Sequence, residues 1–134
     1  MKIARIFSVM VLAAVATVAG QAAADNCKSP DVKVVNDRTS AIEVTKIQYL
    51  DGCQGKWRTE NVQKKEIPAG YFMYFHDDLE HVEGCAIRKF RLFRAHRNPT
   101  GTAYDAPTWG PELTPDEGSS KACTSTQRYT IHAN

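Results

Sequence analysis

Four cysteines constrain the fold of this chain more than any other feature of its sequence. They are Cys27, Cys53, Cys85 and Cys123, with spacings of 26, 32 and 38 residues. These spacings contain none of the close cysteine pairs that are typical of tetrahedral zinc sites, so we favour disulfides over a zinc centre. An even number of cysteines in an exported chain predicts two disulfides.

The N-terminus has the three parts of a secretory signal peptide. Lys2 and Arg5 make it basic, an apolar run follows over residues 6–20, and Ala22-Ala23-Ala24 offers a cleavage site between small residues. The run of 15 residues is shorter than the roughly 20 that a membrane-spanning helix needs. The pattern therefore predicts no transmembrane anchor and an exported protein, periplasmic or secreted, of bacterial type.

Cleavage after residue 24 divides the chain into a signal peptide, residues 1–24, and one mature domain, residues 25–134. The whole chain has 17 basic and 15 acidic residues. Removing Lys2 and Arg5 leaves 15 of each, so the mature domain is neutral. A neutral domain lacks the overall positive charge that supports binding to nucleic acid, and we expect no nucleic-acid partner.

The mature sequence alternates between apolar and polar residues within short segments bounded by turn residues, which is typical of β-strands. The expected strands cover residues 31–35, 41–50, 57–62, 71–76, 85–96 and 124–132. They predict an all-β fold, a small antiparallel β-sandwich with two disulfides.

Three segments allow more detailed predictions. The apolar parity of residues 41–50 changes midway, which predicts a β-bulge near Thr45-Lys46. Residues 71–76 are apolar on both faces, which favours a central strand covered on both sides. In the last strand, Tyr129 and Ile131 are expected to point into the core.

Two segments allow alternatives. Residues 77–84 can form one helical turn ended by Gly84. Residues 85–96 can also form a helix, with Ile87, Phe90 and Phe93 on one face, although we favour a strand.

The strand order suggests which cysteines pair. Up-and-down pairing of the strands would place the turn that holds Cys53 beside the start of the strand at Cys85. This favours a Cys53–Cys85 disulfide and leaves Cys27 to pair with Cys123.

A basic segment lies in the strand over residues 85–96 and just beyond it. Alternation would place Arg88 and Arg94 on the face of Phe90 and Leu92, with part of their side chains buried. The basic residues of this segment are Arg88, Lys89, Arg91, Arg94, His96 and Arg97. Their local positive field indicates an anionic partner. The alternative is a solvated strand face whose charges pair across the sheet with acids such as Glu43 and Glu60.

The segment from His76 to Glu83 is rich in potential metal ligands, among which His76, Asp78 and His81 are the candidates. A histidine and a glutamate here could also act as an acid–base pair in a hydrolytic enzyme. The spacing matches neither a zinc-protease helix nor an EF-hand loop, so an acidic, exposed turn is the favoured interpretation. We predict no metal and no cofactor.

Residues 98–121 are rich in proline and glycine and predict a long loop. Tyr104 and Trp109 in this loop resemble the aromatic anchors of protein interfaces in composition, or they attach the loop to the core. Trp57 is expected to be a core residue. Phosphate loops and the nucleophile elbow of serine hydrolases are absent.

These features predict an exported binding module of the cell envelope rather than an enzyme. Its candidate binding residues are Arg88, Arg91, Arg94, Arg97, Tyr104 and Trp109, and its partner would be a protein or an anionic envelope component. An inhibitor or immunity protein fits this size and compartment. The alternatives are a metal-binding or hydrolytic protein using His76 to Glu83, and a structural accessory of a secretion or surface assembly.

Overall fold

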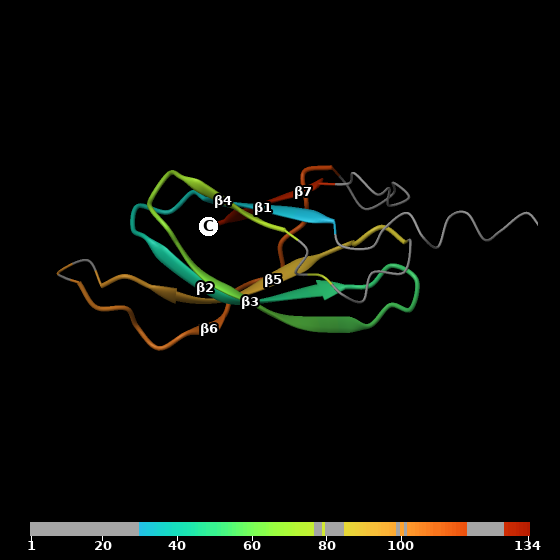
Figure 1. Ribbon diagram of the computed structural model, residues 1–134, viewed down its shortest axis with the longest axis horizontal. Helices are drawn as coiled ribbons and strands as arrows, with labels where there is room; N and C mark the ends of the chain where they lie inside the picture. Colours follow the sequence, from blue (N-terminus) through green and yellow to red (C-terminus); the bar gives the residue numbers. More distant parts are fainter. Residues whose placement is uncertain (1–29, 77–78, 80–84, 99, 101, 118–127) are drawn as a thin grey trace, which may run out of the picture.

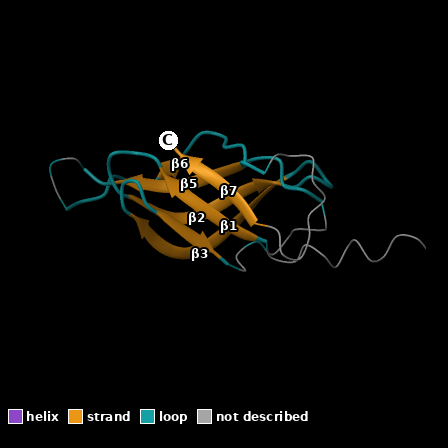
Figure 2. Cartoon of the chain, turned by 90° about the horizontal axis from the view of Figure 1, so that it is seen from above, coloured by secondary structure: helices purple, strands orange, loops and turns teal. Residues whose placement is uncertain are grey.

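The computed structural model describes residues 30–76, 79, 85–98, 100, 102–117 and 128–134. Within these residues the fold is all-β, with no helix (Figure 2). The strands are β1 (Asp31–Asn36), β2 (Ile42–Leu50), β3 (Trp57–Ile67), β4 (Phe72–Phe75), β5 (Phe90–His96), β6 (Thr108–Trp109) and β7 (Arg128–Ala133).

The strands form two sheets that pack face to face (Figure 1). One sheet has the order β4-β1-β7 and the other has the order β3-β2-β5-β6. No helix in the described part of the chain is long and apolar enough to span a membrane.

The core lies between the two sheets and follows from the alternation of the sequence. In β1 and β7 every second side chain is buried, and Tyr129 and Ile131 point inward as predicted. The other sheet contributes apolar side chains that include Ile47, Tyr49 and Leu92, all fully buried. Because successive residues of a strand face opposite sides, each sheet has one apolar inner face and one outer face.

The sandwich is mixed rather than purely antiparallel, which corrects the sequence-based prediction. β1 and β7 pair in parallel, with Asp31 opposite Arg128 and Asn36 opposite Ala133. The other strand pairs are antiparallel. β1 and β7 are distant in the sequence, so no hairpin turn requires them to run in opposite directions.

The predicted bulge in β2 is confirmed. The register of β2 against both β3 and β5 shifts between Val44 and Lys46, so Thr45 lies at the irregularity. The shift lets Ile42, Val44 and then Ile47 all face the core, although their spacing breaks simple alternation.

The prediction that residues 71–76 form a central strand is wrong. β4 lies at the edge of the three-stranded sheet, and Phe72 is 48% exposed. The outward aromatic rings are covered by cations instead of a second layer: Lys33 Nζ lies 4.2 Å from the Phe72 ring centre, and Arg128 lies 4.7 Å from that of Tyr74. A strand with apolar residues on both faces can therefore stand at an edge when long basic side chains lie over one face.

Other strand limits also differ from the prediction. β3 continues to Ile67, and β5 begins at Phe90 rather than at residue 85, so residues 85–96 form neither one long strand nor a helix. The predicted helical turn over residues 77–84 lies outside the described residues except for Leu79, which is buried in the core.

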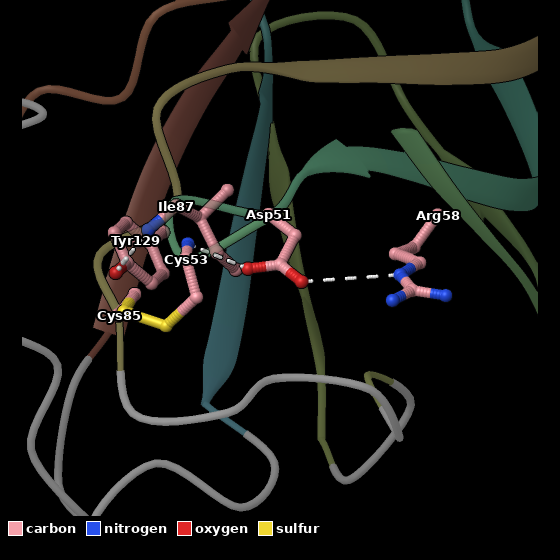
Figure 3. The surroundings of a disulfide bond; sticks show 6 residues. All are labelled: Asp51, Cys53, Arg58, Cys85, Ile87 and Tyr129. Atoms are coloured by element: carbon pink, nitrogen blue, oxygen red, sulfur yellow. Dashed lines mark hydrogen bonds and ion pairs between the residues drawn. A yellow bond between two sulfur atoms is a disulfide. The ribbon is translucent and has the colours of Figure 1, made fainter. Parts of the chain in front are cut away.

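The predicted Cys53–Cys85 disulfide is present (Figure 3). It joins the β2–β3 turn to the segment before β5, because antiparallel pairing of β2 with β5 brings those two ends together. The carboxylate of Asp51, which is buried, accepts the Cys53 N–H at 2.8 Å and shapes this turn. The predicted Cys27–Cys123 pair and the signal peptide lie outside the described residues, so one disulfide is seen rather than two.

At the opposite end of the sandwich, Asn36 joins three segments of backbone. It is fully buried. Its side-chain amide donates to the carbonyl oxygens of Ser40 and Ile67, each at 2.9 Å, and to that of Pro68 at 3.2 Å, while its side-chain oxygen accepts the Arg38 N–H at 3.1 Å. One side chain thus holds the end of β1, the β1–β2 turn and the β3–β4 turn together.

We expect Asn36→Asp to lower the free energy of unfolding by about 2 to 4 kcal/mol, since it leaves buried carbonyls without donors and places a carboxylate against them. Chemical denaturation measures the change. Asn61→Asp, on an exposed position of β3, is the matched control and should change stability by less than about 0.5 kcal/mol. Equal stability of the Asn36 variant and the wild type would contradict the assignment.

Replacing Cys53 and Cys85 together by alanine should lower the free energy of unfolding by about 3 to 4 kcal/mol, because the disulfide closes a separation of 32 residues in the unfolded chain. Urea unfolding of the variant and of the wild type under oxidising conditions tests this. A loss below about 1 kcal/mol would indicate that the native contacts around Asp51 hold the turn without the covalent bond.

Candidate functional site

The outer surface of the four-stranded sheet carries a cluster of aromatic and basic side chains, which we call the aromatic–cationic face. It consists of Lys46, Trp57, Arg91, Phe93 and Trp109, all partly exposed. The Arg91 guanidinium lies 6.0 Å from the ring centres of both Trp57 and Trp109. The rings of Phe93 and Trp109 pack with their centres 5.1 Å apart, and Lys46 Nζ lies 5.1 Å from the Phe93 ring centre.

Strand register brings these residues together. Alternation along β5 buries Phe90 and Leu92 and turns Arg91 and Phe93 outward. β6 places Trp109 opposite Phe93, and β2 places Lys46 opposite Phe93 on the other side. Arg91 Nε also donates to the Gly110 carbonyl at 3.3 Å, which holds the guanidinium beside β6.

The composition of this face suits the binding of another molecule. Tryptophan and arginine are the residues most enriched among the energetic hot spots of protein interfaces. Arg91 has no carboxylate within ion-pair distance among the described residues. Its guanidinium lies beside two aromatic rings, and Arg91 and both tryptophans are partly exposed.

The structure divides the predicted basic segment among different environments. Arg88 is exposed and precedes β5, whereas Arg91 lies on the aromatic–cationic face. Arg94 is 4% exposed and Arg97 lies at the far end of β5, near Tyr104. The four arginines thus do not form one surface. Of the acids expected to pair with them, Glu43 pairs with Lys64 at 3.2 Å, and Glu60 accepts a hydrogen bond from Tyr49 at 3.0 Å.

The position of Arg94 differs most from the prediction. The sequence predicted that only part of its side chain is buried, whereas nearly all of Arg94 is buried. Its Nη2 donates to the Asn134 carbonyl at 2.9 Å, and its guanidinium packs against Gly110. Burial lowers the pKa of Arg94, and the nearby positive charge of Arg38 lowers it further. Arg94 therefore lies inside the sandwich rather than on a binding surface.

Tyr104 and Trp109 of the predicted loop occupy separate places. Trp109 belongs to β6 and to the aromatic–cationic face. Tyr104 forms an antiparallel bridge with Arg97 beyond the end of β5. Burial, and then the nearby Glu66 carboxylate, raise the pKa of Tyr104 to about 12. The Glu66 carboxylate is near enough to raise the pKa of the Tyr104 hydroxyl, although the distance and angles between the two groups do not meet those of a hydrogen bond.

The predicted metal candidates are described only in part. His76 is exposed; its Nδ1 lies 2.8 Å from a carboxylate oxygen of Asp31, and its ring stacks on Tyr74. Asp78 and His81 lie outside the described residues. Among the residues that the structure describes, no group of three histidine, cysteine or carboxylate side chains is arranged so that it could hold a metal ion.

Sequence reasoning missed part of the aromatic–cationic face. The prediction that Trp57 is a core residue is wrong, since this side chain is half-exposed beside Arg91. Lys46 and Phe93 were not singled out. Phe93 has the opposite parity to the inward residues Phe90 and Leu92, and this parity was a signal for an exposed aromatic ring. Trp57 and Lys46 join the face only through the pairing of strands that are distant in the sequence.

Comparison with protein-family models, with curated proteins and with solved structures finds no match to this chain.

A second polar cluster joins three segments at one side of the molecule. His132 of β7 lies between two carboxylates: its Nδ1 is 2.6 Å from Asp37 and its Nε2 is 2.9 Å from Asp116. The hydrogen bonds to Asp116 and Asp37 raise the pKa of His132. At the end of β5, by contrast, burial and the charges of Arg38 and Arg94 lower the pKa of His96.

These opposite shifts predict a pH dependence of stability. Because folding raises the pKa of His132, its contribution to the free energy of unfolding is complete below 6.5, the pKa of histidine in the unfolded chain. This contribution is lost as the pH rises through the higher folded pKa. The His96 contribution is complete above 6.5 and is lost as the pH falls below that value. We expect the stability difference between the wild type and His132→Gln to shrink between pH 6 and pH 8 in thermal unfolding. A constant difference would contradict the two-carboxylate contact.

Proposed function

We propose that this protein is an exported binding module that recognises a protein partner through its aromatic–cationic face. The observation that carries the proposal is the position of Arg91 between Trp57 and Trp109, at 6.0 Å from each ring centre. A cation shared by two partly exposed indole rings offers apolar area and charge in one rigid patch.

The scaffold supports this proposal. The side chains of the face all arise from strands, namely β2, β3, β5 and β6, and not from a free loop. Side chains held in place before binding lose little conformational freedom when a partner docks. A disulfide at the Cys53 turn supports an oxidising compartment, which agrees with export to the periplasm or the medium.

An inhibitor or immunity protein is the specific role that we propose within this class. Such proteins need a rigid, stable surface rather than catalytic groups, and the face provides an arginine and two tryptophans that are held on strands. The partner would present a carboxylate to Arg91 and an apolar surface to the rings.

The double variant Arg91→Ala, Trp109→Ala tests the proposal. The wild-type protein, immobilised by a tag, should retain a partner from a periplasmic extract, and recovery measured by quantitative mass spectrometry should fall at least tenfold for the variant. Loss of two hot-spot side chains explains this size, since each is worth about 2 kcal/mol or more.

Tyr74→Ala, Arg128→Ala is the matched control, because it removes a cation–aromatic pair from the outer face of the other sheet. This control should leave recovery unchanged. Equal recovery by the wild type and by the Arg91 variant, with both proteins folded by circular dichroism, would refute the proposal.

A further inference from the structure

Polar atoms without partners gather at one end of the sandwich. Among the described residues, nine buried side-chain nitrogen or oxygen atoms have no hydrogen-bond partner, and six of them lie on five residues at this end. The six atoms are Arg38 Nε, Arg94 Nε, Arg94 Nη1, His96 Nδ1, Arg97 Nε and Tyr104 Oη. Buried polar atoms without partners are uncommon, and each requires an explanation.

A hollow of about 790 Å³ lies at the same end. It is lined by the β1–β2 turn, by the end of β3 and the turn that follows it, and by the end of β5 and the chain after it, which lie at the same end of the sandwich in Figure 1. Its charged and imidazole side chains are Arg38, Glu66, His96, Arg97 and Asp105. Its volume is within the range of small-molecule sites.

The backbone around the hollow is held by hydrogen bonds. The Arg38 N–H donates to the side-chain oxygen of Asn36 at 3.1 Å, and the Arg97 N–H donates to the Ala41 carbonyl at 3.0 Å. The Asp105 N–H donates to the His96 carbonyl at 2.9 Å. The two arginines and the histidine therefore project from fixed positions rather than from a free loop.

The arginines of the hollow lack acidic partners. Among the described residues, no carboxylate lies within ion-pair distance of Arg38 or Arg97. The positive charge of Arg38 lies near enough to Arg94 to lower the pKa of Arg94, and the charges of both arginines lower the pKa of His96. The hollow thus holds two guanidinium groups that form no ion pair with a described carboxylate, although Glu66 and Asp105 also line it.

We propose that this hollow is a binding site for the oxyanion of a small hydroxylated molecule, a phosphate or sulfate ester, held by Arg38 and Arg97 with His96 beside it. Guanidinium groups bind tetrahedral oxyanions through paired, charge-assisted hydrogen bonds. Arg38 and Arg97 both line the hollow, and each guanidinium carries several N–H donors.

The two acids that line the hollow define the rest of the ligand. Glu66 lies near Tyr104, and Asp105 lies near His96. Their carboxylates accept hydrogen bonds from hydroxyl groups and repel a second negative charge. The hollow is also larger than one phosphate ion needs. A singly phosphorylated or sulfated polyol satisfies both the donors and the acceptors, whereas a polyanion does not.

Titration of the full mature protein followed by NMR tests this proposal. The probes are inorganic phosphate, glycerol 1-phosphate and glycerol, and the readout is the ¹⁵N–¹H signal of the arginine Nε–H groups, assigned with Arg38→Gln and Arg97→Gln. Both phosphates should shift the Arg38 and Arg97 signals in a saturable manner, and glycerol alone should not. Tighter binding of glycerol 1-phosphate supports an ester as the ligand, and equal binding supports the free ion in the same site.

Substitutions that remove a positive charge and one that removes a negative charge strengthen the test. Arg38→Gln and Arg97→Gln should each weaken phosphate binding by about tenfold, whereas Glu66→Gln should tighten it. Arg58→Gln is the matched control, because Arg58 lies near the Cys53 turn, where its Nε is 3.9 Å from Asp51. Phosphate binding by this variant should equal that of the wild type.

The absence of saturable shifts, or equal affinities for the wild type and Arg38→Gln, would overturn the proposal. None of these residues belongs to the aromatic–cationic face, so a negative result here leaves the proposed function intact.

Discussion

The hydrogen bonds of Asn36 are the constraint on which one end of the structure depends. β3 and β4 are consecutive in the sequence but belong to different sheets, so the chain must cross between layers at Pro68 to Gly70. The buried Asn36 amide binds carbonyls on this crossing and on the β1–β2 turn. Backbone hydrogen bonds of Asn36 with Gly70 and Tyr71, each 2.8 Å, complete the junction. The same contacts position Arg38 and thereby shape the hollow beside it.

Both outer faces of the sandwich use cation–aromatic contacts, but the contacts differ in kind. On the three-stranded sheet, Lys33 and Arg128 each lie within 5 Å of one ring centre and cover it. On the four-stranded sheet, Arg91 lies 6.0 Å from two indole rings and covers neither closely. Contacts of the first kind shield an edge strand that would otherwise expose its aromatic rings. The second kind leaves the charge and the ring surface partly exposed, which is why we propose that face for binding.

Local patterns predicted much of the fold because they depend on adjacent residues. The parity change in β2 identified the bulge at Thr45, and the alternation of Tyr129 and Ile131 identified the inner face of β7. The Cys53–Cys85 disulfide was also predicted, because it requires only that the end of β2 lie near the segment before β5. The edge position of β4 was not predictable from its own residues, because it depends on which cations from β1 and β7 lie over its rings.

The sequence by itself determined that this chain is a β protein with a cross-linked turn, because alternation and cysteine spacing act over short distances or through covalent bonds. Only the tertiary structure decided which side chains share a surface. Strand register brought Trp57 and Lys46 to Arg91, and it placed Arg94, a neighbour in the sequence, inside the sandwich. The physical reason is that pairing between distant strands, and not sequence proximity, sets the distances over which charge, aromatic surface and hydrogen bonds act.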